Sequence, residues 1–352
     1  MKFIFFGTPE FAAIILEKLI AADYVPVAVV CNPNEPVGRK QILTPPLVKR
    51  LIEKHLPAGR QEGPIEIFQP ATKLDLLALC PKLSAIAPDF MVIAAYGKII
   101  PKEILDIPYR GTLNIHPSLL PKYRGTSPIQ YAILKGDKET GVTIMGVDEE
   151  MDHGPILANS ILPIANSDTY EILSQKLAIS GAELLIKTIP YFISGNIKPI
   201  EQDHSKATYT KIIKKEDGEI YWLKNADEIE RMTRAYYPWP TSWTTWNNRI
   251  LKIIETKPLE SSEKDFTDSA IADFVKWPIG RVFLYNSIIA VKCGQGALII
   301  KKLQLEGGKV LTAKEFLNGH KNFVGSVLKQ KKTRAKWLAQ ATTDATPERL
   351  TL

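Results

Sequence analysis

The sequence contains few cysteines and no long uninterrupted apolar run. Cys31, Cys80 and Cys293 are few, odd in number and far apart, so they build neither a disulfide framework nor a CxxC metal site. The opening segment MKFIFFGTPEF is interrupted by a glycine, a proline and a glutamate before it reaches the length of a signal peptide. We find no apolar stretch near the roughly 18 residues that a membrane-spanning helix needs. We therefore expect a cytoplasmic protein with buried free thiols, no metal site and no membrane segment.

The sequence also lacks the two common glycine-rich phosphate-binding motifs. Neither GxGxxG nor GxxxxGK[ST] occurs, so the sequence gives no support to a dinucleotide site or a P-loop. Gly7 does follow the first apolar run, but there Thr8 is expected to cap a helix whose first residue is Pro9. This segment is therefore predicted to be structural.

Apolar runs alternate with helical patterns through the first part of the chain. Four runs are rich in the branched and aromatic residues of buried strands: 2–7, 25–30, 90–97 and 111–116. Segments with helical spacing lie between them, which predicts an α/β, Rossmann-like and mostly parallel sheet with helices on both faces. Ligands in such sheets bind at the carboxyl ends of the strands. A strand pair at 141–148 and 155–164 and one long amphipathic helix at 168–194 are predicted to follow.

Residues 196–212 have little periodicity and are predicted to form a linker. Beyond one helix at 224–236, short strands are separated by turn residues: 249–256, 280–294 and 296–309. This pattern is typical of a small, mostly β domain, and we expect an OB-like barrel. We place the boundary after Asp203, which gives a catalytic domain at 1–203 and a second domain at 204–352.

Charge is divided unequally between these two parts. Residues 1–203 hold 20 Lys and Arg against 22 Asp and Glu, a net charge of −2, whereas residues 204–352 hold 25 against 16, a net charge of +9. The basic excess of the second part suits a polyanion such as nucleic acid, although basic surfaces also occur simply for solubility. The cluster KQKKTRAK (329–336) is a candidate for phosphate contacts, or only an exposed charge run.

Polar side chains gather in NIHPS (114–118), at the end of a predicted central strand. Alternation along a strand places Asn114, His116 and Ser118 on one face, where a ligand is expected. An isolated histidine is more commonly a satisfied core residue beside a turn. Asp152, in a loop crowded with turn residues, could equally be an ordinary turn former.

The run from Asn114 to Leu157 resembles the signature region of the folate-dependent formyltransferases. Its parts appear in order as Asn-x-His, SLLP, RG and a loop of the Met-Asp-x-Gly type. Within that family, FFGTPEFA, VGRK (37–40), VIAAYGKIIP, ATYTKIIKKEDGEIYW and YYPWPTSWTTW resemble the methionyl-tRNA formyltransferases rather than the shorter glycinamide ribonucleotide formyltransferases. The resemblance covers nearly the whole chain. The segment 55–66 is longer than is usual in that family between the second helix and the third strand, and the segment after Lys336 does not resemble the family.

The resemblance implies that 10-formyltetrahydrofolate is the formyl donor and that the amino group of methionyl initiator tRNA is the acceptor, for translation initiation. It implies these site residues: Asn114, His116 and Asp152 for catalysis, Ser118, Leu119, Leu120 and Pro121 for folate, and Arg39 and Lys40 for tRNA. No metal is required.

Such a reaction needs a base, because only a neutral amine attacks and an α-amino group has a pKa of about 7.7 to 8.0. We expect Asp152 to take the proton directly or through one water. The Asn114 amide and the His116 ring are expected to donate to the oxyanion that forms, and His116 to pass a proton to the departing folate nitrogen.

Two other enzymatic functions stay open from the residues alone: formyl transfer to a small amine, such as an amino sugar or glycinamide ribonucleotide, and hydrolysis of the formyl-folate. A non-catalytic RNA-binding protein is disfavoured because Asn114, His116 and Asp152 occur together. Only a tRNA acceptor gives the basic second part an obvious purpose. The tryptophans at 239, 243 and 246 are expected to pack the second domain rather than to stack on bases. We expect a monomer.

Overall fold

A computed structural model describes residues 1–38, 40–55, 64–259 and 274–330. The chain divides into two units, and each consists of several segments. Unit 1 comprises 1–129, 138–165 and 172–211, and unit 2 comprises 130–137, 166–171 and 212–352. The last segment of unit 1 therefore extends past Asp203 to Lys211.

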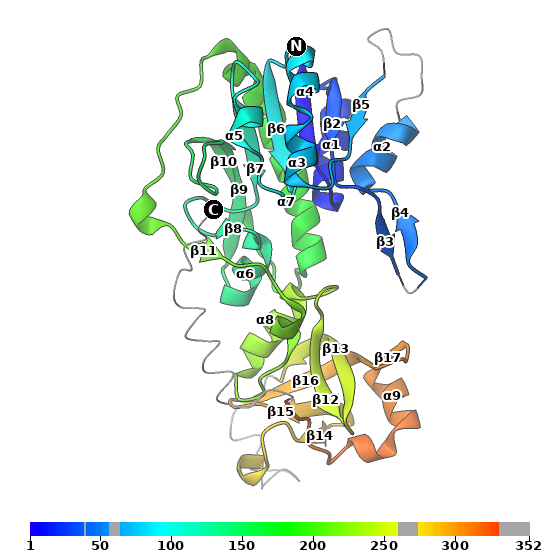
Figure 1. Ribbon diagram of the computed structural model, residues 1–352. Coiled ribbons are helices and arrows are strands. Elements are labelled where there is room, and N and C mark those ends of the chain that lie inside the picture. Colours follow the sequence, from blue (N-terminus) through cyan, green and yellow to red (C-terminus); the bar gives the residue numbers. More distant parts are fainter. Residues whose placement is uncertain (39, 56–63, 260–273, 331–352) are drawn as a thin grey trace. The chain divides into compact units, whose positions relative to one another are not determined.

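A seven-stranded sheet of order β10-β9-β7-β6-β1-β2-β5 forms the centre of unit 1 (Figure 1). Its strands are β1 (Phe3–Gly7), β2 (Ala28–Val30), β5 (Glu66–Phe68), β6 (Phe90–Ala94), β7 (Thr112–His116), β9 (Glu139–Gly146) and β10 (Ile156–Pro163). The strands from β5 to β7 in this order pair in parallel, whereas β9 is antiparallel to both β7 and β10. The predicted mostly parallel sheet and the predicted strand pair are thus confirmed.

Helices cover both faces of this sheet, because successive side chains along a strand point to opposite faces and strands such as β1, β2 and β6 are buried and apolar at nearly every position. Ile4 and Phe6 of β1 lie in one core cluster with apolar residues of α3 (Lys73–Leu77), α4 (Cys80–Ile86) and α5 (Lys102–Leu105). On the opposite face, α1 (Glu10–Ala21) packs against β1 and β6, and α2 (Leu47–His55) packs against α1.

The long helix α7 (Tyr170–Ser194) packs against β7, the strand that carries Asn114 and His116, and against β9. A side chain at Gly181 would crowd Ile115 of β7 and Val142 of β9, so the glycine allows close packing of helix and sheet. Leu173, Leu177 and Leu185 are among its fully buried residues. By length and composition alone α7 is also apolar enough to cross a membrane, although no membrane segment was expected from the sequence.

The start of α1 differs from the prediction. The helix begins at Glu10, so Pro9 and not Thr8 occupies the N-cap position, and no side chain caps the helix. The Thr8 hydroxyl instead accepts a hydrogen bond of 3.1 Å from the backbone N–H of Asn32. Thr8 therefore links the ends of β1 and β2.

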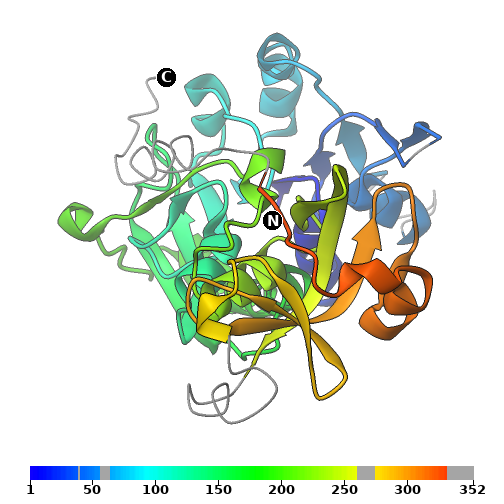
Figure 2. The ribbon, with the colours of Figure 1, turned by 90° about the horizontal axis from the view of Figure 1, so that it is seen from below.

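An antiparallel sheet forms the core of unit 2, with the order β12-β13-β16-β15-β14 and with β17 paired to β16. Its strands are β12 (Ser242–Trp246), β13 (Arg249–Pro258), β14 (Val282–Tyr285), β15 (Ile288–Lys292), β16 (Ala297–Leu305) and β17 (Val310–Thr312). Residues 326–329 hydrogen-bond to both edge strands of this sheet. The Ser326 carbonyl accepts from the backbone N–H of Val282 in β14, and Lys329 pairs with Thr245 of β12. One segment thus joins the two edges, and the sheet closes into the expected small barrel (Figure 2). Among its described residues this unit contains the helices α8 (Ala226–Ala235) and α9 (Ala313–Gly319), and α6 (Pro128–Lys135) from Gln130 onward.

The tryptophans of the aromatic segment have different environments. Trp246 is buried and packs edge to face on Phe316 and Phe323, as expected for a residue that anchors the domain. Trp239 is 57% exposed, so the expectation of packing is wrong for this residue. It lies in the loop before β12, a strand that was not predicted from the sequence.

Candidate active site

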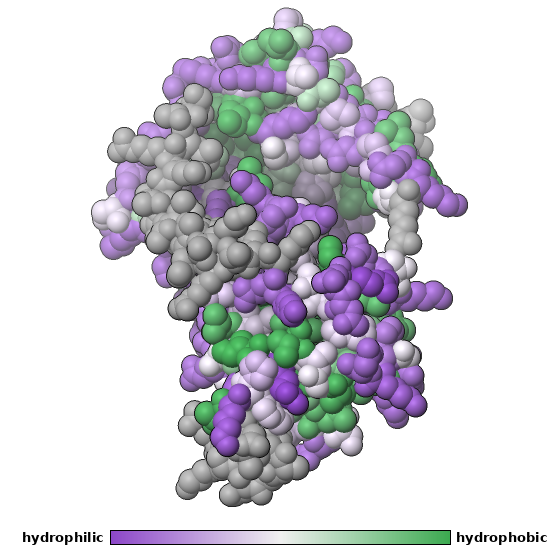
Figure 3. Space-filling model, turned by 60° about the horizontal axis from the view of Figure 1, so that its bottom comes forward, coloured by the Kyte–Doolittle hydropathy of each residue, from purple (hydrophilic) through white to green (hydrophobic). Residues whose placement is uncertain are grey.

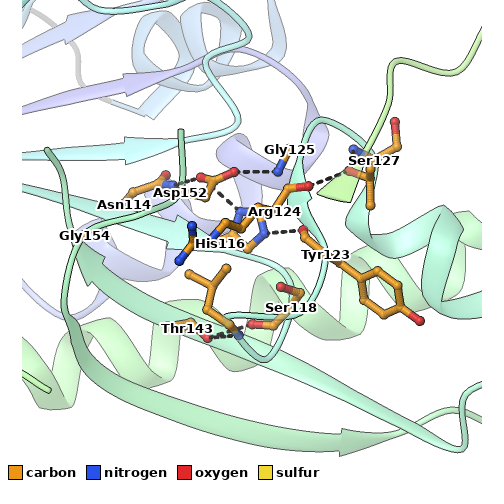
Figure 4. A network of polar contacts seen from close by, with 12 residues as sticks. Asn114, His116, Ser118, Tyr123, Arg124, Gly125, Ser127, Thr143, Asp152 and Gly154 are labelled. Carbon is orange, nitrogen blue, oxygen red and sulfur yellow. Dashed lines mark hydrogen bonds and ion pairs between the residues drawn. The ribbon is translucent and has the colours of Figure 1, made fainter. Parts of the chain in front are cut away.

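Asn114, His116 and Asp152 meet at the carboxyl end of β7 (Figure 4). Asn114 Nδ2 donates to Asp152 Oδ1 at 3.3 Å, and His116 Nδ1 lies 3.4 Å from the same oxygen. Ile115 faces α7, so alternation along β7 turns Asn114 and His116 to the other face of the sheet. The Asp152 side chain is only 13% exposed and that of His116 only 5%. The three side chains therefore interact in surroundings where water screens them little.

The backbone of Tyr123 determines which nitrogen of His116 carries hydrogen. His116 Nε2 lies 2.9 Å from the Tyr123 carbonyl oxygen, which can only accept, so Nε2 must donate. His116 Nδ1 then faces the Asp152 carboxylate, and a hydrogen bond between them requires a second ring proton.

The Asp152 carboxylate accepts hydrogen bonds at both oxygens. Gly125 donates its backbone N–H to Oδ2 at 2.8 Å, while Asn114 donates to Oδ1. Asp152 itself has a φ of 51°, a left-handed conformation that is uncommon outside glycine. Its side chain is therefore aimed at β7 by a loop whose conformation the surroundings must maintain.

The segment from Ser118 to Pro121 follows the strand and forms a loop held by its own contacts. The Ser118 hydroxyl donates to the Lys122 carbonyl at 2.6 Å, and the Thr143 hydroxyl donates to the Ser118 carbonyl at 2.7 Å. Leu120 donates its N–H to Thr143 Oγ1 at 3.2 Å. Because β7 ends at His116, Ser118 is outside the strand, and its hydroxyl does not share the face of Asn114 as alternation had suggested.

Residues 202–210 lie within the segment 196–212 that was predicted to form a linker, and they contact this site closely. β11 (Tyr209–Thr210) pairs in parallel with β8 (Arg124–Gly125), and Thr208 exchanges hydrogen bonds with the backbone of residues 121–124. Gln202 contacts the backbone of the loop that carries Asp152. The sequence carried one signal for this segment, since Ala-Thr-Tyr-Thr (207–210) is rich in residues that favour strands.

The proposed tRNA loop is the turn of a separate hairpin. β3 (Glu35–Val37) and β4 (Ile42–Thr44) form a two-stranded sheet of their own, and Lys40 is exposed in the turn between them. Arg39 lies outside the described residues, as do residues 56–63 of the long segment and residues 331–336 of the basic cluster.

Cysteines and metal-ligating residues give no second reactive centre in the described part of the chain. No group of three or more His, Cys, Asp or Glu among the described residues could hold a metal ion. Burial raises the pKa of the Cys31 thiol to about 11 and that of Cys293 to about 12, so both are protonated near neutral pH. Cys80 is half-buried.

Comparison with known proteins gives consistent matches over most of the chain. A family model described as formyl transferase matches residues 1–189, and one described as formyl transferase, C-terminal domain, matches residues 212–321. Methionyl-tRNA formyltransferases of Halalkalibacterium halodurans and Caldicellulosiruptor saccharolyticus are each 40% identical to this chain over 93% of its length, and the matches cover 98% and 100% of those proteins.

Solved structures with the same fold are more distant in sequence. HypX from Aquifex aeolicus in complex with tetrahydrofolic acid matches with a TM-score of 0.59 at 17% identity, covering 95% of this chain and 51% of that chain. An N-formyltransferase from Helicobacter canadensis, in complex with folinic acid and dTDP-3-aminofucose, matches with a TM-score of 0.59 at 20% identity, covering 85% of this chain and 98% of that chain. At these identities the likeness establishes the fold.

Proposed function

The chain belongs to the methionyl-tRNA formyltransferases, and from that premise we propose that Asn114, His116 and Asp152 carry out its reaction. The enzyme transfers the formyl group of 10-formyltetrahydrofolate to the free amino group of methionyl-tRNA. The observation that carries the assignment is that the side chains of Asn114 and His116 both approach one carboxylate oxygen, Asp152 Oδ1. A base, an ionisable ring and an amide donor within reach of one another are what formyl transfer to an amine requires.

Asp152 serves as the base in this proposal. The amino group must lose a proton as its nitrogen attacks the formyl carbon, and the carboxylate is the acceptor-only group of the site. The Gly125 N–H and the Asn114 amide keep the carboxylate oriented before the substrate arrives. The proton of the amine therefore moves to Asp152 directly or through one water.

Attack places a negative charge on the formyl oxygen, and Asn114 and His116 stabilise it. Asn114 Nδ2 and His116 Nδ1 both lie close to Asp152 Oδ1 in this structure, so the substrate oxygen must bind beside that carboxylate to reach them. Loss of one such donor typically lowers the rate about 10²- to 10³-fold.

Collapse of the intermediate completes the transfer. The new bond joins the methionine nitrogen to the formyl carbon, and the bond from that carbon to the folate nitrogen breaks. His116 gives its Nδ1 proton to the leaving folate nitrogen, and Asp152 holds the proton taken from the amine. The reaction is then balanced, with one proton taken up and one released inside the site.

Other parts of the chain bind the two substrates in this proposal. We assign folate to the segment Ser118, Leu119, Leu120 and Pro121, in which the Ser118 hydroxyl shapes the loop. Arg39 and Lys40 contact the acceptor end of initiator tRNA, and the basic second part of the chain binds its backbone. Hydrophilic side chains are interspersed with hydrophobic ones over the described part of the surface seen in Figure 3. We further propose that the enzyme is a cytoplasmic monomer.

Three substitutions test the catalytic assignment: Asp152→Asn, His116→Ala and Asn114→Ala. Each is expected to lower turnover by orders of magnitude with little change in folding or in tRNA binding. Asp148→Asn is a matched control, because Asp148 also pairs with a histidine, His153, at 2.7 Å in the same loop. The assignment fails for any of the three residues whose variant turns over like Asp148→Asn.

A further inference from the structure

Gln202 binds the backbone of the catalytic loop from the segment that follows α7. Its Nε2 donates to the Asp152 carbonyl at 2.9 Å and to the Gly154 carbonyl at 2.7 Å. Both amide hydrogens are therefore used on the two carbonyls that flank His153. Gln202 is only 5% exposed, so water competes little for these bonds.

Arg124 fixes the orientation of that amide. Its Nη2 and Nε donate to Gln202 Oε1 at 2.7 and 3.2 Å, and its Nη2 also lies 2.8 Å from His204 Nδ1. A flipped Gln202 amide would turn its NH2 group toward the guanidinium and its oxygen toward two carbonyls. The buried Arg124, 2% exposed, thus ensures that the amide donates to the loop.

Asp152 depends on this kind of support because its own backbone is left-handed. A φ of 51° costs free energy for a residue with a side chain, although aspartate tolerates it better than most, so contacts to this backbone help to maintain it. Gly125 and Asn114 contact the Asp152 carboxylate, whereas Gln202 contacts the backbone that carries it.

We infer that Gln202, oriented by Arg124, is a positioning residue that sets where the Asp152 carboxylate lies relative to His116. The inference rests on the proposed catalytic role of Asp152. Gln202 touches only the carbonyls of the loop, so it acts through Asp152 and not on the reacting atoms. The segment after α7, which leads to unit 2, is therefore a working part of the active site and not only a connection.

Gln202→Glu isolates this role. Glutamate has the same shape and still pairs with Arg124, but it places an oxygen against the carbonyls of Asp152 and Gly154. Displacing a catalytic group by about 1 Å lowers the rate roughly 10²-fold, so we expect kcat to fall about 10- to 100-fold. KM for folate and for Met-tRNA should change less than about twofold, because the contacts to substrate are unchanged. Gln175→Glu, on the exposed part of α7, makes the same change of charge in the same unit and should leave kcat unchanged.

Combining Gln202→Glu with Asp152→Asn separates positioning from a general structural role. If Gln202 acts through Asp152, adding Gln202→Glu to the Asp152→Asn variant should lower kcat less than about twofold, because the carboxylate has already been removed. An equal loss in both backgrounds, or an unchanged kcat in the wild-type background, overturns the inference. Arg124→Lys, which keeps the charge but loses the fork, should show the same non-additivity and replaces Gln202→Glu if that variant does not fold. Normal turnover of Asp152→Asn alone would instead refute the proposed function.

Discussion

Gly154 offers the sharpest test of how the Asp152 loop is built. A Cβ at this position would overlap the Gly146 carbonyl oxygen and lie 3.1 Å from the Gly146 carbonyl carbon. Both are backbone atoms of β9, which cannot turn aside as a side chain can. Gly154→Ala must therefore displace the loop by on the order of 1 Å, which corresponds to a rate loss of about 10²-fold. At 1.36 kcal/mol for each tenfold step, the activation free energy rises by about 2.7 kcal/mol.

The assay is kcat for formyl transfer at saturating folate and Met-tRNA, with thermal unfolding measured beside it. Gly146→Ala is the matched control, because a Cβ there would make only ordinary contacts, the nearest to Pro155 Cγ at 3.6 Å. We expect Gly146→Ala to stay within about threefold of the wild-type rate. The reasoning is refuted if Gly154→Ala also stays within that range, or if both variants lose the same activity.

Three further predictions concern tRNA and the buried thiols. Replacing Arg39 and Lys40 together by Ala should raise KM for Met-tRNA with little effect on folate binding; an equal effect on both substrates would mean that the hairpin supports the fold. The affinity for tRNA should fall with salt at a log-log slope of roughly −0.7 to −0.9 per phosphate contact, and residues 1–211 alone should show a flatter slope than the full chain; equal slopes would assign tRNA binding to the catalytic unit. The cut belongs after Lys211, because residues 204–210 hydrogen-bond to the active-site segment. Burial raises the pKa of the Cys31 thiol from 9.0 to about 11, so the stability that the protonated thiol contributes is complete below pH 9 and is lost as the pH rises through 11. Between these two pH values, the free energy of unfolding in urea should depend less on pH for Cys31→Ser than for the wild-type protein. An unchanged pH dependence would contradict burial of this thiol as the cause.

Much of the fold follows from local patterns in the sequence. Strands β1, β6 and β7 are short runs of branched and aromatic residues, and the helices between them show regular apolar spacing, so the parallel sheet could be predicted. A small barrel was also expected, but the segment that closes it could not be predicted, because residues 326–329 have no strand pattern of their own and pair with two edges far away in the sequence.

The active site was predictable only in part. Strand alternation places Asn114 and His116 on one face, but the position of Asp152 beside them depends on a contact with Asn114 that spans 38 residues of sequence. Gln202 was missed because its segment has no periodicity and its contact with Asp152 spans 50 residues. Ser118 was misplaced because the strand ends two residues before it. Long-range contacts of this kind are set by tertiary packing, which local propensity does not encode.

The most direct test of the proposed catalysis is a single-turnover measurement of formyl transfer from 10-formyltetrahydrofolate to methionyl initiator tRNA, with both substrates bound at saturation. We predict that the wild-type protein and Asp148→Asn form N-formylmethionyl-tRNA at similar rates, that uncharged tRNA accepts no formyl group, and that Asp152→Asn is slower by orders of magnitude at unchanged tRNA affinity. Formation of product by Asp152→Asn at the wild-type rate would contradict the account.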